Sequence, residues 1–133
     1  MSSGLLALGM DVVEVPRFRR VLARRPRLAD RVFTEAEKAY GMRARDPAQR
    51  LAARFAAKEA TMKALGVGLG GFSFREVEVV KARSGAPSLA LTGRAAELAA
   101  RRGVRAFRVT LTHTDLMAAA VVVALAEEPE VPA

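Results

Sequence analysis

The feature that most limits how this chain can fold is the stretch from Asp46 to Gly66. Asp46-Pro47 is a strong helix start, because a carboxylate caps the first turn and proline suits the first helical position. Gly66 is typical of the residue that follows a last helical turn. No proline or glycine lies between Pro47 and Gly66. We therefore expect one long helix from Pro47 to Leu65.

The other segments alternate between helical and strand patterns. Shorter helices are expected from Arg17 to Arg25, where Pro26 should end the helix, over about 35–44, and from Arg94 to Arg102. A Thr34/Glu37 capping box should open the second of these. Strands are expected from Leu5 to about Asp11 and over 73–82, 88–92, 105–112 and 117–126. The short connection around His113 makes the last two antiparallel.

This mixture predicts an α+β fold in one domain, residues 1–126, followed by a frayed tail, residues 127–133. Composition excludes several kinds of site within it. The chain has no cysteine and one histidine, which rules out a disulfide framework, a thiolate nucleophile and a multi-histidine metal site within one chain. We also find no apolar run of the roughly 18 residues that span a bilayer, and no secretory signal. We expect a cytoplasmic protein without a membrane partner.

Positive charge indicates the kind of partner. The formal net charge is +8, which favours an acidic protein, a nucleic acid or a phosphate-rich small molecule. Arginines recur at helical spacing from residue 17 onward, and the group before Pro26 comprises Arg17, Arg20 and Arg24. This group is either a docking face or an ordinary solvated face. A non-enzymatic module that binds nucleic acid is the alternative hypothesis, although the chain contains no recognisable nucleic-acid motif.

Within the long helix, one lysine and one Glu/Lys pair call for an explanation. The apolar stripe consists of Leu51, Phe55, Met62 and Leu65. Lys58 projects near its middle, so its ammonium needs an acidic partner or a route to solvent. Glu59 and Lys63 are four residues apart, on a face shared with Ala52 and Ala56. They form either an ordinary surface pair or a site, since the alanines leave room for a ligand or another chain.

Two further polar residues stand out on the predicted strands. Asp11 ends an apolar strand, where it either caps the following helix or coordinates a hard cation. Together with Glu59 it could supply a Mg²⁺ site, with Lys63 and arginines neutralising phosphates. His113 continues the alternation of its strand's buried face, and by pattern alone it is a core histidine.

Two stretches resemble bacterial holo-acyl-carrier-protein synthases. They are Gly9–Phe18 (GMDVVEVPRF) and Arg54–Gly66 (RFAAKEATMKALG), and their separation also fits the family. Shorter matches follow in the same order, at 33–37, at Gly85-Ala86-Pro87 and at 110–114. The resemblance covers residues 5–125. It implies a trimeric 4′-phosphopantetheinyl transferase with a small antiparallel sheet around a long helix and active sites between subunits.

The same resemblance implies an activity and a set of site residues. Such enzymes transfer 4′-phosphopantetheine from coenzyme A to a serine of an apo acyl carrier protein and release adenosine 3′,5′-bisphosphate. The Mg²⁺ ligands fall on Asp11 and Glu59, and the active-site lysine falls on Lys63. The positions lining coenzyme A are Arg54, Lys63, Gly66 and His113, and Arg17 matches a carrier-protein contact. The acceptor of the serine proton stays open between Glu59, a water on the metal and the His113/Asp115 corner.

Overall fold

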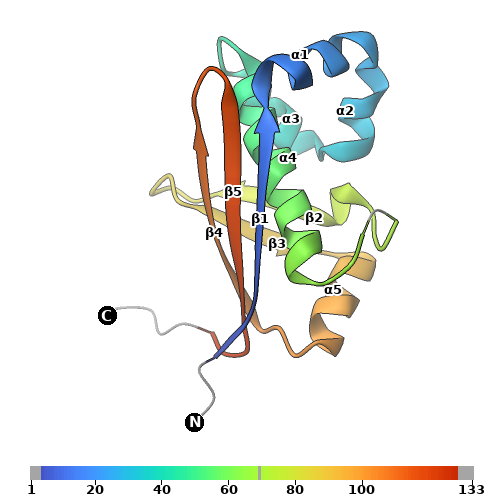
Figure 1. Ribbon diagram of the computed structural model, residues 1–133, viewed down its shortest axis with the longest axis vertical. Helices are drawn as coiled ribbons and strands as arrows, with labels where there is room; N and C mark the ends of the chain where they lie inside the picture. Colours follow the sequence, from blue (N-terminus) through green and yellow to red (C-terminus); the bar gives the residue numbers. More distant parts are fainter. Residues whose placement is uncertain (1–3, 69, 129–133) are drawn as a thin grey trace.

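A three-stranded antiparallel sheet with a long helix packed on one face forms the centre of the molecule (Figure 1). The structure is a computed structural model that describes residues 4–68 and 70–128. The strands are β1 (Leu5–Glu14), β5 (Met117–Leu125) and β4 (Ala106–His113), in that order across the sheet, and the helix is α4 (Pro47–Ala64). β5 is therefore the middle strand, and β1 and β4 are the two edges. The expected α+β class is confirmed, as is the antiparallel pairing of β4 with β5.

Helix α4 approaches the sheet closely through its alanines. Ala56 and Ala60 are fully buried, and both pack with Ala120 and Val122 of β5. Gly9 of β1 faces the helix so tightly that an added Cβ would lie 1.8 Å from the carbonyl oxygen of Ala60. The expectation that Ala52 and Ala56 leave room for a ligand or another chain is wrong, because both are fully buried within the chain's own core.

Both ends of α4 carry the signals expected from the sequence. The Asp46 carboxylate accepts a hydrogen bond from the Ala48 N–H (3.2 Å). At the other end Gly66 adopts a φ of 71°, and the N–H groups of Gly66 and Val67 donate to the carbonyls of Lys63 and Met62. These two bonds form the motif that closes many helices on a glycine. The helix thus ends at Ala64, one residue earlier than expected.

The remaining elements surround this centre. Helices α1 (Val15–Arg24), α2 (Pro26–Val32) and α3 (Glu35–Met42) lie together at one end, and α5 (Gly93–Arg101) lies at the other (Figure 1). The hairpin of β2 (Val77–Lys81) and β3 (Pro87–Leu91) follows a short 3₁₀ turn, η1 (Phe74–Glu76). None of the helices described is long and apolar enough to cross a membrane.

Other differences from the sequence prediction concern α2, β1 and the segment before β2. α2 was not expected, because Pro26 indicated only the end of α1, whereas proline also suits the first turn of a new helix. β1 continues to Glu14, and its pairing with β5 is regular from Ala7 to Glu14, with a register shift between Leu5 and Ala7. The predicted strand 73–82 starts with η1, since Ser73 and Glu76 form a capping box there. The predicted tail lies outside the described residues from position 129 onward.

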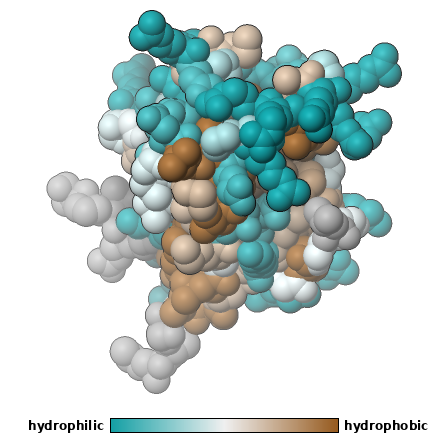
Figure 2. Space-filling model, turned by 45° about the horizontal axis from the view of Figure 1, so that its top comes forward, coloured by the Kyte–Doolittle hydropathy of each residue, from teal (hydrophilic) through white to brown (hydrophobic). Residues whose placement is uncertain are grey.

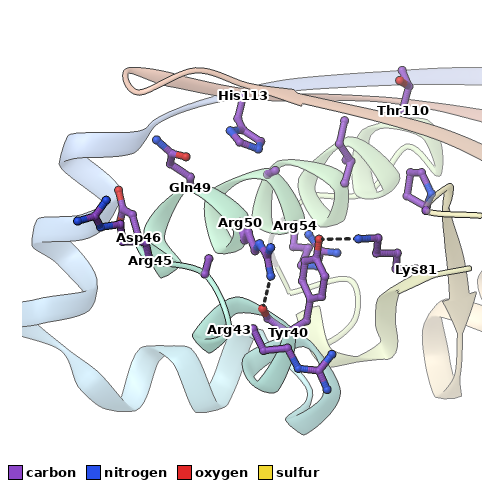
Figure 3. A pocket seen from close by; sticks show the side chains of 15 residues that line it. Tyr40, Arg43, Arg45, Asp46, Gln49, Arg50, Arg54, Lys81, Thr110 and His113 are labelled. Carbon is purple, nitrogen blue, oxygen red and sulfur yellow. Dashed lines mark hydrogen bonds between the residues drawn. The ribbon is translucent and has the colours of Figure 1, made fainter. Parts of the chain in front are cut away.

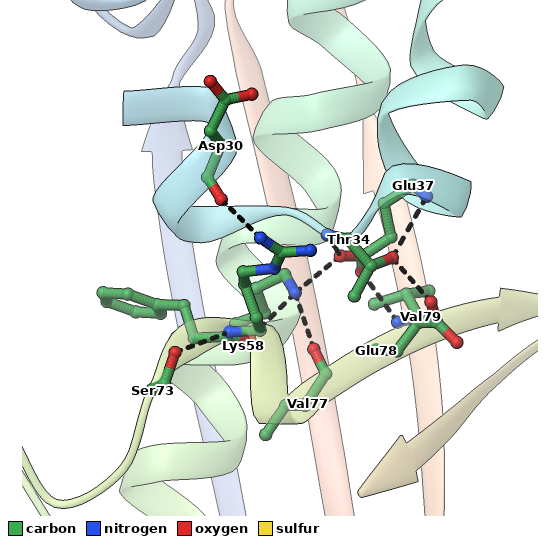
Figure 4. A network of polar contacts seen from close by, with 10 residues as sticks. Asp30, Thr34, Glu37, Lys58, Ser73, Val77, Glu78 and Val79 are labelled. Atoms are coloured by element: carbon green, nitrogen blue, oxygen red, sulfur yellow. Dashed lines mark hydrogen bonds and ion pairs between the residues drawn. The ribbon is translucent and has the colours of Figure 1, made fainter. Parts of the chain in front are cut away.

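A buried ion pair joins α4 to α3 and β2 (Figure 4). The Lys58 Nζ donates to Glu37 Oε1 (2.7 Å) and to the carbonyls of Val77 (2.6 Å) and Phe74 (3.0 Å). Glu37 also accepts from the backbone N–H groups of Thr34 and Val79. Both charged side chains are fully buried. The expected acidic partner of Lys58 is therefore Glu37, the same residue that completes the predicted capping box of α3.

Candidate active site

Two carboxylates and a lysine meet where β1 lies against α4. The Lys63 Nζ lies 3.2 Å from Asp11 Oδ1 and donates to the carbonyl oxygen of Met10 (3.0 Å). Burial raises the pKa of Glu59, and the charge of Asp11 raises it further, while Lys63 acts in the opposite direction. Asp11 does not cap α1, whose first turn follows Glu14 without a side-chain cap. The three residues predicted to act together are thus neighbours in one chain.

The chemistry of this pair suits a hard cation. Two negatively charged carboxylates that lie close together repel each other, and a nearby positive ion stabilises both. The Lys63 side chain is largely exposed. Mg²⁺ uses one or two protein carboxylates and completes its shell with water and substrate phosphates. Within residues 4–68 and 70–128 no group of three His, Asp or Glu side chains could hold a metal alone. Asp11 and Glu59 therefore fit Mg²⁺ presented together with a phosphate.

An apolar cavity of about 510 Å³ opens beside the carboxylate pair. Asp11 and Glu59 lie on its wall together with Arg17, while most of the lining is aliphatic or aromatic. Phe18, Phe55 and Phe74 stack in sequence there, with ring centroids 5.5 Å and 5.4 Å apart. Such a mixed surface next to a polar centre is typical of a binding site.

A second cavity, of about 820 Å³, lies on the β4 side of α4 (Figure 3). Its lining is rich in cations, namely Arg43, Arg45, Arg50, Arg54 and Lys81, together with His113 and Tyr40. Its one carboxylate, Asp46, is paired with Arg19. This cavity therefore suits an anion, and a large one, since several cations face the same space.

Arg54 and His113 both belong to this second cavity. Arg54 is only 6% exposed, and its Nε has no hydrogen-bond partner among the described residues. Burial lowers the pKa of Arg54. The interpretation of His113 as a core histidine is wrong, because it sits at the exposed end of β4 beyond the packed part of the strand. Its ring points instead toward the cavity above Gln49 and Arg50 (Figure 3).

The predicted site residues thus fall into two groups within one chain. Asp11 lies on β1 and His113 lies on β4, the opposite edges of the sheet. Among the residues that the structure describes, none lines both cavities. Gly66 lines neither of them and instead closes α4. Arg17, Arg20 and Arg24 are all exposed on α1. Of these, Arg17 lines the apolar cavity beside Asp11 and Glu59.

Sequence reasoning did not identify Tyr40, Arg50 and Lys81 as cavity residues. One available signal was the spacing of Arg50 and Arg54, which places two guanidiniums on one face of the long helix. Tyr40 is also the only tyrosine in the chain. Neither signal indicates that the β2–β3 hairpin brings Lys81 to the same place.

Comparisons with known proteins identify the family of this chain. Residues 7–122 match the ACPS family of the 4′-phosphopantetheinyl transferase superfamily. The chain therefore belongs to this family of phosphopantetheinyl transferases. A relative from Moorella thermoacetica named holo-[acyl-carrier-protein] synthase is 47% identical over 117 residues, which is 88% of this chain and 91% of that protein.

Solved structures give the same result for the fold. The holo-[acyl-carrier-protein] synthase from Neisseria meningitidis superposes with a TM-score of 0.82 at 29% identity, covering 90% of this chain and 98% of that one. The Helicobacter pylori synthase, solved in complex with coenzyme A, gives 0.78 at 28% identity, covering 88% and 98%. The expected enzyme class, holo-[acyl-carrier-protein] synthase, is confirmed by these relatives. The nucleic-acid-binding alternative has no such support.

Proposed function

We propose that this chain transfers 4′-phosphopantetheine from coenzyme A to a serine of an apo acyl carrier protein, with Mg²⁺ held by Asp11 and Glu59. The observation that carries the proposal is the meeting of Asp11, Glu59 and Lys63 beside the apolar cavity. Incubation with coenzyme A, Mg²⁺ and an apo carrier, read by intact mass, tests it. A carrier that stays unmodified at high enzyme concentration would reject the proposal. The cytoplasmic location stays a prediction from the sequence.

Each residue of the carboxylate group has a definite task in this reaction. Asp11 and Glu59 would hold Mg²⁺, which supplies charge stabilisation for the diphosphate when bound. Lys63 adds a positive charge next to the same carboxylates. Attack of the serine oxygen breaks the bond between the phosphorus and the leaving nucleotide, so catalysis consists mainly of positioning and electrostatic stabilisation. Glu59 and the His113/Asp115 corner remain the candidate residues for accepting the serine proton.

The second cavity, which is lined by Arg43, Arg45, Arg50, Arg54 and Lys81 and is called the basic cavity from here on, is our proposed site for the nucleotide end of coenzyme A. Arg54 and His113 line it, as the family resemblance implies for the coenzyme. The unpartnered Nε of Arg54 is a donor that a phosphate oxygen can satisfy, and guanidinium–phosphate hydrogen bonds are among the stronger ones in proteins. The relatives from Helicobacter pylori and Bacillus anthracis were both solved with coenzyme A bound.

The division of the site between two sheet edges supports a trimer with shared sites. In a cyclic assembly, contacts between neighbours are heterologous, so one edge of a protomer can meet the other edge of the next. The Asp11 and Glu59 carboxylates of one chain can thereby join the cation-lined cavity of its neighbour. Lys63 and Gly66, assigned to coenzyme A by resemblance, would then face the coenzyme from the β1 side.

The outer face of the sheet offers a surface for this assembly. Leu6, Leu8, Met10 and Val12 of β1 are between 46% and 61% exposed. Met10 pairs with Val121 and Leu8 with Val123 of β5, so the apolar side chains of both strands lie side by side. Figure 2 shows hydrophobic side chains gathered over the strands, with hydrophilic ones concentrated over the helical end. A contiguous apolar patch of this kind marks an interface.

Leu8→Glu should convert the trimer into monomers and lower turnover with it, because the charge would have to be buried at the interface. Sedimentation velocity over a dilution series and the carrier assay measure the two effects. Ala36→Glu places the same charge on the exposed surface of α3 and should leave both unchanged. A Leu8→Glu monomer with full activity would contradict a site shared between subunits.

Arg17, Arg20 and Arg24 are our proposed docking residues for the acidic carrier protein. Arg17 lines the apolar cavity together with Asp11 and Glu59. In the proposed reaction the serine of the carrier must come close to these two carboxylates. Charged rim residues mainly steer encounter, and their effect weakens as salt screens it.

Arg17→Glu should raise the KM for the carrier about fivefold to tenfold and leave the KM for coenzyme A unchanged, because charge reversal opposes the steering of an acidic partner. Steady-state kinetics with each substrate varied in turn measures the split. Arg101→Glu, an equal charge change at the exposed end of α5, is the control. Equal increases in both KM values would count against the docking role.

A further inference from the structure

Three cations gather around the ring of Tyr40 in the basic cavity (Figure 3). The guanidinium carbons of Arg50 and Arg54 lie 4.2 Å and 4.0 Å from the ring centroid, and the Lys81 Nζ lies 5.1 Å from it. Lys81 also donates to the phenolic oxygen (3.4 Å), and Arg50 donates to the Tyr40 carbonyl (2.8 Å). These contacts connect α3, α4 and the end of β2.

Such a cluster is unfavourable without something to hold it. Among residues 4–68 and 70–128, no carboxylate forms an ion pair with Arg50, Arg54 or Lys81. Like charges that share a cavity repel one another. An aromatic face attracts cations through its quadrupole, most strongly where water is excluded. Burial alone would raise the pKa of Tyr40, but the hydrogen bond from Lys81 and the charges of Arg50 and Arg54 together lower it. All three cations therefore act on the phenol.

A separate set of buried contacts also holds together α3, α4 and β2, the three elements that carry this cluster. The buried Lys58–Glu37 pair ties α4 to α3, and it ties both to β2 through the Val77 carbonyl and the Val79 N–H. The backbones under Tyr40, Arg54 and Lys81 are therefore anchored independently of the cavity. This anchor does not fix the spacing of the charged groups of Arg50, Arg54 and Lys81, and the Tyr40 ring lies between them (Figure 3).

We propose that Tyr40 is a positioning residue that assembles Arg50, Arg54 and Lys81 into a phosphate-binding group before coenzyme A arrives. The inference rests on the proposed function, which places the nucleotide phosphates of coenzyme A in this cavity. Tyr40 acts through the cations and not on the reacting atoms. Removal of the Tyr40 ring lets the three cations separate. Part of the binding energy of coenzyme A must then be used to bring the cations together again.

Tyr40→Leu should raise the KM for coenzyme A about tenfold, while kcat changes less than about twofold and the KM for the carrier stays the same. Tyr40→Phe keeps the ring face and loses only the hydroxyl contact with Lys81, so it should stay within about threefold of the wild-type KM. Met42→Leu, on the exposed side of α3, is the control and should change nothing. Thermal unfolding followed by circular dichroism monitors the fold of each variant.

A second substrate separates positioning from general disruption of the cavity. Because the cations bind phosphate, Tyr40→Leu should also lower the preference for coenzyme A over 3′-dephospho-coenzyme A about tenfold, measured as the ratio of kcat/KM values. An unchanged KM for coenzyme A, an equal loss for both substrates, or a Tyr40→Phe variant as impaired as Tyr40→Leu would overturn the inference. A wild-type enzyme that modifies no carrier would instead overturn the proposed function.

Discussion

Replacing Glu59 by glutamine should lower kcat/KM for the carrier by about a thousandfold, because a bound metal contributes several kcal/mol and each 1.36 kcal/mol corresponds to a factor of ten. Asp11→Asn should have an effect of similar size. Both substitutions keep the size and shape of the side chain, but they remove its charge and replace one oxygen ligand with an NH₂ donor that cannot bind a cation. Intact-mass measurement of carrier modification over time gives the rates.

These two variants should remain folded, and this distinguishes a functional role from a structural one. The charge of Asp11 raises the pKa of Glu59, which means that the two carboxylates destabilise each other in the absence of a cation. Removing one charge relieves that repulsion, so the melting temperature should stay the same or rise slightly. Glu97→Gln, the same chemical change on the exposed face of α5, is the control and should retain full activity.

Metal removal gives an independent measurement of the same site. Treatment of the wild type with a chelator should abolish turnover, and added Mg²⁺ should restore it. Glu59→Gln should not be restored at the same metal concentration. Full activity in either carboxylate variant would remove that residue from the metal site.

The Glu37→Gln substitution should destabilise the protein by about 3–5 kcal/mol, because it leaves the Lys58 ammonium buried without its counter-charge. Burial already lowers the pKa of Lys58, and Glu37 opposes this effect. Since whole domains are stable by only about 5–15 kcal/mol, a large share of the stability would be lost. Chemical denaturation with urea, at a fixed protein concentration, measures the change.

A double-mutant cycle shows whether the effect belongs to the pair. Lys58→Met removes the ammonium charge that Glu37→Gln leaves without a counter-charge. The double variant should therefore lose less unfolding free energy than the sum of the losses in the two single variants. The exposed pair of Lys38 and Asp30 is the control, and Asp30→Ala should change stability very little. Additive effects at Lys58 and Glu37 would contradict their coupling.

Most of the secondary structure could be predicted because its signals act over a few residues. The Asp46 cap, the glycine that closes α4 and the capping box at Thr34 all appear where the sequence placed them. Prediction was less successful where one residue type has two local meanings. Pro26 both ends α1 and begins α2, and Ser73 caps a 3₁₀ turn inside what alternation alone suggested was a strand.

The candidate site residues show the same division. Asp11, Glu59 and Lys63 were proposed from residue types and a family resemblance, and the structure places them together. The grouping of Tyr40 with Arg50, Arg54 and Lys81 was not foreseen, because it needs α3, α4 and the β2–β3 hairpin to meet. No local pattern contains that information.

The amino-acid sequence by itself determined most of the elements of this protein, the need of Lys58 for an acidic partner or a route to solvent, and the candidate carboxylates. Only the tertiary structure decided that Asp11 and His113 lie on opposite edges of one sheet. The physical reason is that strand order depends on which distant segments pair, whereas caps and alternation depend only on near neighbours along the chain. That order separates Asp11 from His113 within one chain, and the proposed trimer with shared sites rests on this separation.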